Sequence, residues 1–92
     1  MRDCMDVGSI VSRLRKVEGQ VRGITNMVQK DVPCEDILVQ IAAVRSALHK
    51  TGQIILEGHL HHCVLDGIEA GNADDTIKKL AKALDQFVRI GK

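Results

Sequence analysis

The stretch CEDILVQIAAVRSALHKTGQIILEGHLHHC, residues 34–63, decides the fold of this 92-residue chain. Its mostly apolar positions recur in steps of three and four, which is the spacing of one helical face. That face comprises Cys34, Ile37, Ile41, Val44, Leu48, Thr51 and Ile55. The pattern predicts a helix over residues 34–64, about 45 Å long at 1.5 Å per residue. Because a compact chain of this length is only about 30 Å across, the helix needs partners outside its own chain.

Two further helical patterns flank this stretch. Residues 6–30 carry a series with heptad-like spacing, formed by Val7, Ile10, Leu14, Val17, Val21, Ile24 and Val28. Pro33 separates this first helix from the second, because proline has no N–H to donate and favours a helix start. After Gly67, Gly71 and Asn72, a shorter helix is predicted over residues 73–88. Its apolar face is formed by Ile77, Leu80, Leu84 and Phe87.

These patterns predict an all-α protein with three helices in a single domain, residues 1–92. The two long helices are expected to form a hairpin. One short third helix cannot cover both long apolar faces, so we expect an obligate oligomer in which hairpins pair into an antiparallel four-helix bundle.

Composition narrows the classes of function. The chain has one aromatic residue, Phe87, and therefore no stacking platform for single-stranded nucleic acid. It shows no secretory signal and no run of 18 apolar residues, which indicates a cytoplasmic protein without a membrane span. Three cysteines in such a protein are expected to be reduced and to bind metal or do redox chemistry.

Charge is unevenly distributed along the chain. Residues 1–30 carry six Lys or Arg against three acids, whereas residues 31–75 carry two against eight. A basic first helix can follow the phosphates of double-stranded DNA, although a solvated helix face is the alternative. The expected DNA-binding residues are Arg13, Arg15, Lys16, Arg22 and Lys50, with Arg45 as a further candidate.

The second helix also carries a candidate metal site. His59 and Cys63 are four residues apart, so on a helix they face the same way. Cys34 lies 25 residues before His59, about 37 Å along a continuous helix, so one chain cannot bring all three together. An antiparallel partner helix can, if the pairing is centred near Leu48. We therefore expect Cys34 from one subunit and His59 and Cys63 from the other.

Two thiolates and an imidazole are soft donors, and three such ligands suit Cu(I). Zinc is a further candidate, because Cys4 in the N-terminal leader could supply the fourth ligand that structural zinc prefers. His61 and His62 point away from the pair at helical spacing. The alternative is that the three residues are unrelated, with Cys34 buried and His59 at the surface.

Three motifs resemble the CsoR/RcnR family. They are RLRKVEGQVRGI at residues 13–24, C-x-x-I with QIAAVRSAL at residues 34–48, and H-x-x-x-C at residues 59–63. The resemblance covers roughly residues 9–90. It implies a dimer of helical hairpins, usually assembled into a disc-shaped tetramer, that binds operator DNA. Inducer binding releases the DNA and derepresses an efflux or detoxification operon.

The ligand pattern resembles that of the family's copper sensors, to which Cys34, His59 and Cys63 correspond. Nickel and cobalt sensors usually add an N-terminal histidine, and that position is Arg2 here. Persulfide sensors lack the histidine. Two positions depart from the copper pattern: Pro33 stands where a tyrosine is common, and Lys79 where a glutamate is common.

Rival functions remain open at this point. Within the same family, Cys34 and Cys63 could form a persulfide- or electrophile-responsive thiol switch, or the site could take Zn or Ni. A metal-storage protein would leave the basic first helix without a role. An enzyme is not expected, because no orienting acid or oxyanion hole accompanies the Cys–His pair.

Overall fold

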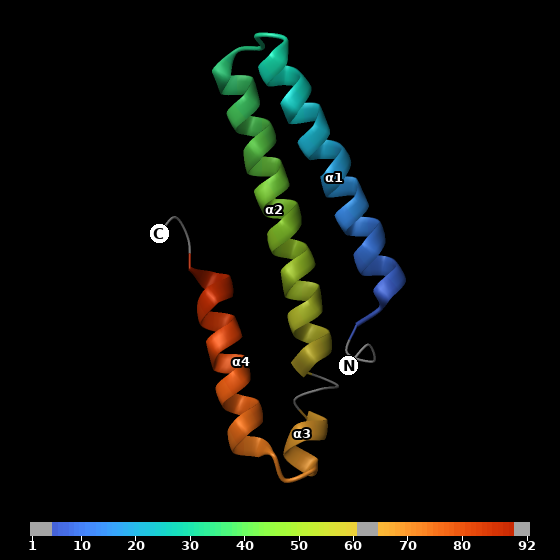
Figure 1. Ribbon diagram of the computed structural model, residues 1–92, viewed down its shortest axis with the longest axis vertical. Coiled ribbons are helices and arrows are strands. Elements are labelled where there is room, and N and C mark those ends of the chain that lie inside the picture. The colour runs from blue at the N-terminus through green and yellow to red at the C-terminus, as the bar shows by residue number, and fades with distance from the viewer. Residues whose placement is uncertain (1–4, 61–64, 90–92) are drawn as a thin grey trace. The chain divides into compact units, whose positions relative to one another are not determined.

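A computed structural model of the chain describes residues 5–60 and 65–89, which are helical apart from short turns and contain no strand (Figure 1). The all-α prediction is confirmed. Asp6–Ile54 forms one compact unit, and residue 5 with residues 55–60 and 65–89 belongs to a second. The single domain over residues 1–92 stays a prediction, and each unit is described by itself.

Helix α1, Val7–Gln29, begins and ends close to the predicted bounds of 6–30. The Asp6 carboxylate accepts a hydrogen bond from the Ser9 N–H at 3.2 Å, which caps the first turn. At the other end the Lys30 N–H donates to the Asn26 carbonyl at 3.0 Å. Asp31 then takes a left-handed conformation with φ of 61°, which ends the helix and turns the chain.

Helix α2, Cys34–Gly58, begins directly after Pro33, as the sequence predicts. The Pro33 carbonyl accepts hydrogen bonds from the Asp36 and Ile37 N–H groups at 3.1 and 3.3 Å. Glu35 and Asp36 place negative charge in the first turn, where the helix dipole favours it. Proline therefore fixes where this helix starts, and with it the position of Cys34.

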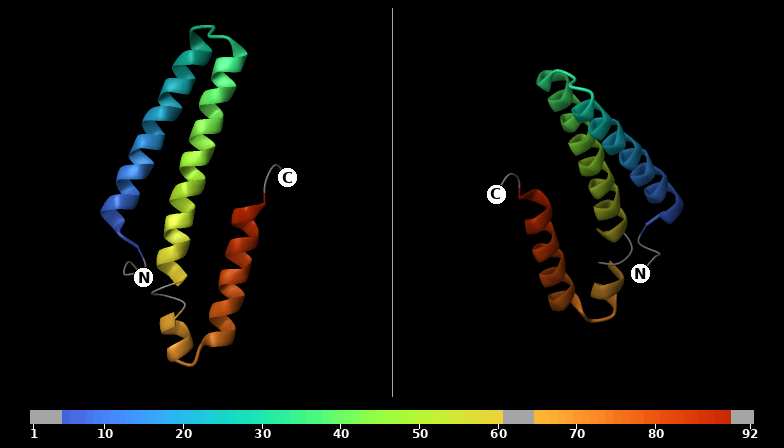
Figure 2. Two further views of the ribbon diagram at one scale, coloured as in Figure 1. Left: turned by 180° about the vertical axis from the view of Figure 1, so that it is seen from behind. Right: turned by 45° about the horizontal axis from the view of Figure 1, so that its top comes forward.

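Within the first unit, α1 and α2 lie side by side and antiparallel (Figures 1 and 2). Ile10 and Val17 of α1 and Val44 and Thr51 of α2 are buried between them. The Thr51 hydroxyl donates to the Ala47 carbonyl at 2.9 Å, so this buried polar group is satisfied. The predicted helical hairpin is confirmed.

The predicted apolar series do not all face this interior. Four members of the α1 series stay exposed: Val7, Leu14, Val21 and Val28. On α2, Ile41 and Leu48 are also exposed, at 44% and 46%. A single hairpin buries or half-buries every second member of each series, so most of the remaining members form a separate apolar surface.

The end of α2 departs from the prediction of a helix to residue 64. Its α-helical part ends at Gly58, and His59 and Leu60 follow in a wider π-helical turn. Glycine is a poor helix former, which explains the change of winding at this point. Residues 61–64 lie outside the described residues.

The second unit contains helix α3, Leu65–Glu69, and helix α4, Ala73–Val88. The bounds of α4 match the prediction, but α3 was not expected, so the described residues hold four helices rather than three. Gly67 was interpreted as part of a turn. Instead it lies in α3, and the Thr76 side chain of α4 sits over it, leaving no room for a β-carbon.

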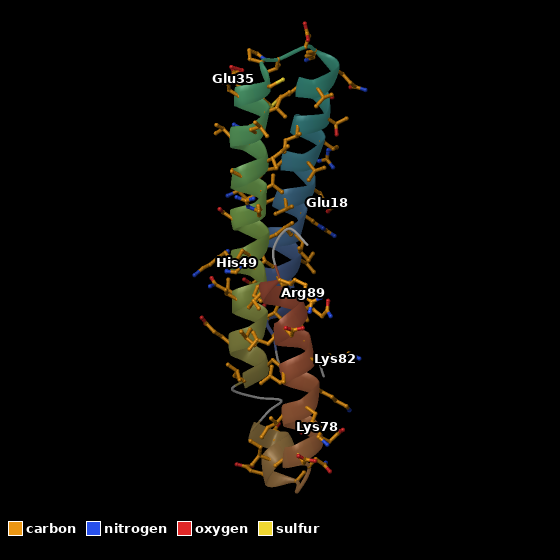
Figure 3. The ribbon with its side chains drawn as sticks, turned by 90° about the vertical axis from the view of Figure 1, so that its left-hand side faces the viewer. Glu18, Glu35, His49, Lys78, Lys82 and Arg89 are labelled. Atoms are coloured by element: carbon orange, nitrogen blue, oxygen red, sulfur yellow. The ribbon has the colours of Figure 1, made fainter. Side chains whose placement is uncertain are left out.

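The outer face of α4 carries ion pairs between residues one turn apart. Asp74 pairs with Lys78 and Asp75 with Lys79, both at 3.2 Å, and Asp85 pairs with Arg89 at 2.9 Å. Lys78, Lys82 and Arg89 follow one another along this helix (Figure 3). No helix in the described ranges has the length and apolar character needed to span a membrane.

Candidate metal centre and nucleic-acid interface

Cys34, the first predicted ligand, is the first residue of α2. Its thiol is exposed and forms no disulfide. In the single chain Cys34 is therefore not a core residue, whereas the alternative reading has it buried. A reduced and accessible thiol at a fixed helix start can bind a soft metal ion or react with an electrophile.

His59, the second predicted ligand, is half-buried and directly follows α2. α2 is an unbroken α-helix of 25 residues, which is about 38 Å long. Cys34 opens this helix and His59 follows its last residue, so the two cannot meet on one ion while α2 stays helical. α2 is therefore long enough to keep Cys34 and His59 of the same chain apart.

The remaining candidate ligands lie outside the described residues: Cys4, His61, His62 and Cys63. Among the residues that the structure does describe, no three His, Cys, Asp or Glu side chains gather closely enough to hold a metal ion. The donor set itself fits Cu(I), because thiolate and imidazole are soft ligands and three of them satisfy a trigonal ion.

Cys34 belongs to an exposed surface of the hairpin that we call the outer seam. Its α1 members are Val7, Val11, Leu14, Glu18, Val21, Thr25 and Val28, and its α2 members are Cys34, Leu38, Ile41, Arg45, Leu48 and Gly52, all within the unit Asp6–Ile54. Both rows step by four and three residues, which is the heptad spacing of helices that pack together. Most of the apolar members are more than a third exposed.

The two rows of the outer seam lie on the same side of the hairpin. In α1, Glu18 follows the buried Val17 by one residue, and in α2, Arg45 follows the buried Val44 by one. Because both helices are right-handed and they run antiparallel, the residue that follows a buried, inward-facing residue lies on the same side of the hairpin in each helix. The seam is therefore one continuous, largely apolar surface that includes Cys34.

The opposite side of the hairpin carries cations that we call the basic face: Arg13, Lys16 and Lys50. Arg13 and Lys16 precede the buried Val17 by four and one residues, and Lys50 precedes the buried Thr51 by one. Arg13 is 17 residues before Lys30 and Lys50 is 17 after Pro33, so the two lie at the same level of the hairpin. The sequence pattern predicted each of these residues to bind DNA, but it did not indicate that the three share one side of the hairpin.

Arg15 and Arg22, the other predicted DNA-binding residues, are seven apart and share a different side of α1. All five predicted cations are exposed, and no ion pair joins any of them to another described residue. The Arg22 guanidinium rests near Gly19, within 3.7 Å of where a β-carbon would lie. These charges are therefore available to an anionic partner.

The structure also describes Pro33 and Lys79, the two positions that depart from the copper pattern. Pro33 starts α2 through its carbonyl, as described above. Lys79 is exposed and pairs with Asp75 of its own helix. This lysine cannot act as the hydrogen-bonding glutamate that is common at this position in the copper sensors that the chain resembles.

Comparisons with known proteins show the family of this chain. A model of the family described as metal-sensitive transcriptional repressor matches residues 2–86. The copper-sensing transcriptional repressor CsoR of Bacillus subtilis is 46% identical over 80 residues, covering 87% of this chain and 79% of that protein.

Two solved structures share the fold. The copper-sensing repressor CsoR with Cu(I) from Geobacillus thermodenitrificans has a TM-score of 0.87 at 40% identity, covering 90% of this chain and 86% of that one. The nickel-responsive transcriptional regulator InrS has a TM-score of 0.79 at 37% identity, covering 90% and 93%. The resemblance drawn from the three motifs is confirmed, and the chain belongs to the family of metal-sensitive transcriptional repressors.

Proposed function

We propose that this protein represses transcription by binding operator DNA in the cytoplasm and releases it on binding Cu(I). The observation that carries the proposal is the accessible Cys34 thiol on the outer seam, a full helix length from His59. The similarity to the copper-sensing repressors of Bacillus and Geobacillus supports copper as the inducer.

The site is shared between two subunits. Cys34 of one chain faces the partner subunit's His59 and the partner subunit's Cys63, and two-fold symmetry creates a second, equivalent site. Cu(I) bound by these donors would join the two chains at both ends of the paired α2 helices. The outer seam around Cys34 is covered by the same pairing, so the metal site and the subunit interface are one surface.

The smallest assembly that completes the site is this dimer. A dimer of dimers is the assembly that the family resemblance implies, and we propose it for the DNA-bound form. The basic face of each hairpin lies opposite the outer seam, so pairing through the seam leaves Arg13, Lys16 and Lys50 exposed to DNA.

Repression and release are coupled through the shape of this assembly. The basic faces contact phosphates, which gives binding that weakens steeply with salt. Metal binding lowers DNA affinity only if Cu(I) binds more tightly to one conformation of the assembly than to the conformation that binds DNA. In the conformation that Cu(I) prefers, the basic faces would no longer match the spacing of the phosphates. Because a lysine stands at position 79 and supplies no acid, this coupling runs through the position of the helices themselves.

The test is a DNA-release titration under anaerobic, reducing conditions. A duplex selected from random sequence by the apoprotein is labelled, and its affinity is measured as Cu(I) is added. We expect affinity to fall by about 10-fold or more at one Cu(I) per subunit, a coupling energy of about 1.4 kcal/mol. Unchanged affinity at stoichiometric Cu(I) would refute the proposal.

The similarity to the nickel-responsive regulator makes Ni(II) the natural comparison metal, and Zn(II) belongs in the same series. Release by Ni(II) or Zn(II) but not by Cu(I) would identify a different metal sensor. The exposed Cys34 thiol also supports a second candidate, a thiol switch. Polysulfide treatment followed by mass spectrometry tests it, because a covalent Cys34–Cys63 link between subunits that abolishes DNA binding would favour the switch.

A further inference from the structure

The outer seam is interrupted by one charge on each helix. On α1, Glu18 stands between Leu14 and Val21, and on α2, Arg45 stands between Ile41 and Leu48. All four apolar neighbours are exposed in the single hairpin, at 39% to 47%. Each charge therefore occupies a position where the heptad spacing calls for an apolar residue.

The two charges lie at the same level and on the same side of the hairpin. Glu18 is 12 residues before Lys30, and Arg45 is 12 residues after Pro33. Both side chains are exposed, and neither forms an ion pair with another described residue. Figure 3 shows Glu18 on α1.

Covering the outer seam with a second hairpin would take these charges out of water. A buried charge without a partner is strongly destabilising, whereas a paired one is tolerated. The pairing that aligns Cys34 with the partner subunit's ligands is centred near residue 48. Arg45 is three residues from that centre, so the two copies of Arg45 lie about 9 Å apart along the axis, and the long side chains of both copies come within reach of one another near the middle of the bundle.

We propose that Glu18 and Arg45 of two copies form a neutral four-charge cluster that fixes the register in which the hairpins pair. This inference rests on the paired hairpins of the proposed function and adds residues that position the site without touching the metal. A slip by one heptad would move Cys34 about 10 Å from the partner subunit's His59. The apolar members of the seam tolerate such a slip, but the two charges do not, since each would then face apolar residues.

The experiment is a charge swap in the full chain, read by sedimentation equilibrium without metal or DNA. Glu18→Arg and Arg45→Glu each leave four like charges at the centre, and we expect each to weaken dimerisation by about 100-fold or more. The double variant Glu18→Arg/Arg45→Glu restores opposite charges, and we expect its dimerisation to return to within about 10-fold of the parent.

Lys30→Glu is the control for dimerisation, because Lys30 is exposed, follows α1 directly and lies outside the outer seam. We expect it to dimerise like the parent. Circular dichroism reports helix content for every variant. Single variants that dimerise as tightly as the parent, or a double variant no better than the single ones, would overturn the proposal. A parent chain that is monomeric would overturn it as well.

A second variant distinguishes an effect on the register of the paired hairpins from an effect on the affinity of dimerisation. Glu18→Leu/Arg45→Leu fills the seam with apolar side chains, so it is expected to dimerise at least as tightly as the parent. Without the charges its register is no longer unique, and we expect Cu(I) affinity to fall by about 10-fold. Parent-like Cu(I) affinity in this variant would overturn the positioning role. The charge swap is measured without metal, so a failure of the copper proposal would not affect its result.

Discussion

The hairpin of α1 and α2 and the helix α4 both carry many cations, but they hold them differently. In the hairpin, Arg13, Lys16 and Lys50 form a basic face and pair with no other described residue. In α4, Lys78 and Lys79 each pair with an aspartate one turn earlier. The charge count of a segment therefore does not show whether its cations are paired with acids of the same helix, whereas the ion pairs of the structure do.

The largest effect is expected from the basic face. The triple variant Arg13→Ala/Lys16→Ala/Lys50→Ala should lower operator affinity on the order of 100-fold or more and reduce the slope of log affinity against log salt by about 2 to 3 for each subunit that contacts the duplex. Fluorescence anisotropy over a salt series measures both. The matched control is Lys78→Ala/Lys79→Ala, which removes two cations that aspartates already neutralise. Equal losses in the two variants would abolish the distinction between the regions.

A smaller effect is expected for the other side of α1. Arg15→Ala/Arg22→Ala removes two cations that share a side with neither Lys50 nor the buried positions. Operator affinity should fall, with a slope change of about 2 for each subunit in which both residues contact phosphates. Because the basic face draws on both helices, the triple variant should lose more. If Arg15→Ala/Arg22→Ala binds the operator as the parent does, these two residues leave the interface and the basic face carries it alone.

Two glycines, one in each unit, differ in how tightly they are packed. Thr76 occupies the space beside Gly67, and a β-branched side chain has little freedom to move away. Gly67→Ala should destabilise the packing of α3 against α4 by about 1 to 3 kcal/mol. Gly23→Ala on α1 meets open space and should stabilise by about 0.5 to 1 kcal/mol. Urea unfolding at one fixed protein concentration compares them, and a stabilising Gly67→Ala would rule out this close approach.

The smallest effect concerns the α4 ion pairs. Asp74→Asn/Asp75→Asn releases Lys78 and Lys79, and exposed pairs of this kind contribute about 0.2 to 1 kcal/mol each. Thermal unfolding should therefore change little. Non-specific DNA affinity at low salt should rise, because two cations become available. No rise would indicate that α4 lies away from the duplex regardless of its pairing.

Much of this fold was accessible from local sequence signals. The Asp6 cap, Pro33 and the apolar spacing each act within a few residues, so the ends of α1, the start of α2 and both ends of α4 follow from them. The end of α2 did not, because helical spacing alone does not reveal that Gly58 lets the chain widen into a π-helical turn. α3 was missed because its packing depends on Thr76, nine residues after Gly67.

The candidate site was predictable in its residue types and less so in its surfaces. The sequence supplies Cys34, His59 and Cys63 with their spacing, and the length of α2 agrees with the argument for two chains. The apolar spacing of one helix could not reveal that alternate members face two surfaces, the interior of the hairpin and the outer seam. That division requires knowing which members the hairpin buries, and it brings out Glu18 and Arg45 as interruptions of the outer seam.

The sharing of one metal site between two subunits is tested most directly by mixing defective chains. Cys34→Ala is co-expressed with His59→Ala/Cys63→Ala, and the mixed dimer is purified through two different tags. A shared site predicts that each parent variant alone binds Cu(I) weakly, while the mixed dimer regains one tight site with sulfur and nitrogen ligands by X-ray absorption. A mixed dimer that binds Cu(I) no better than the two parent variants would contradict the shared site.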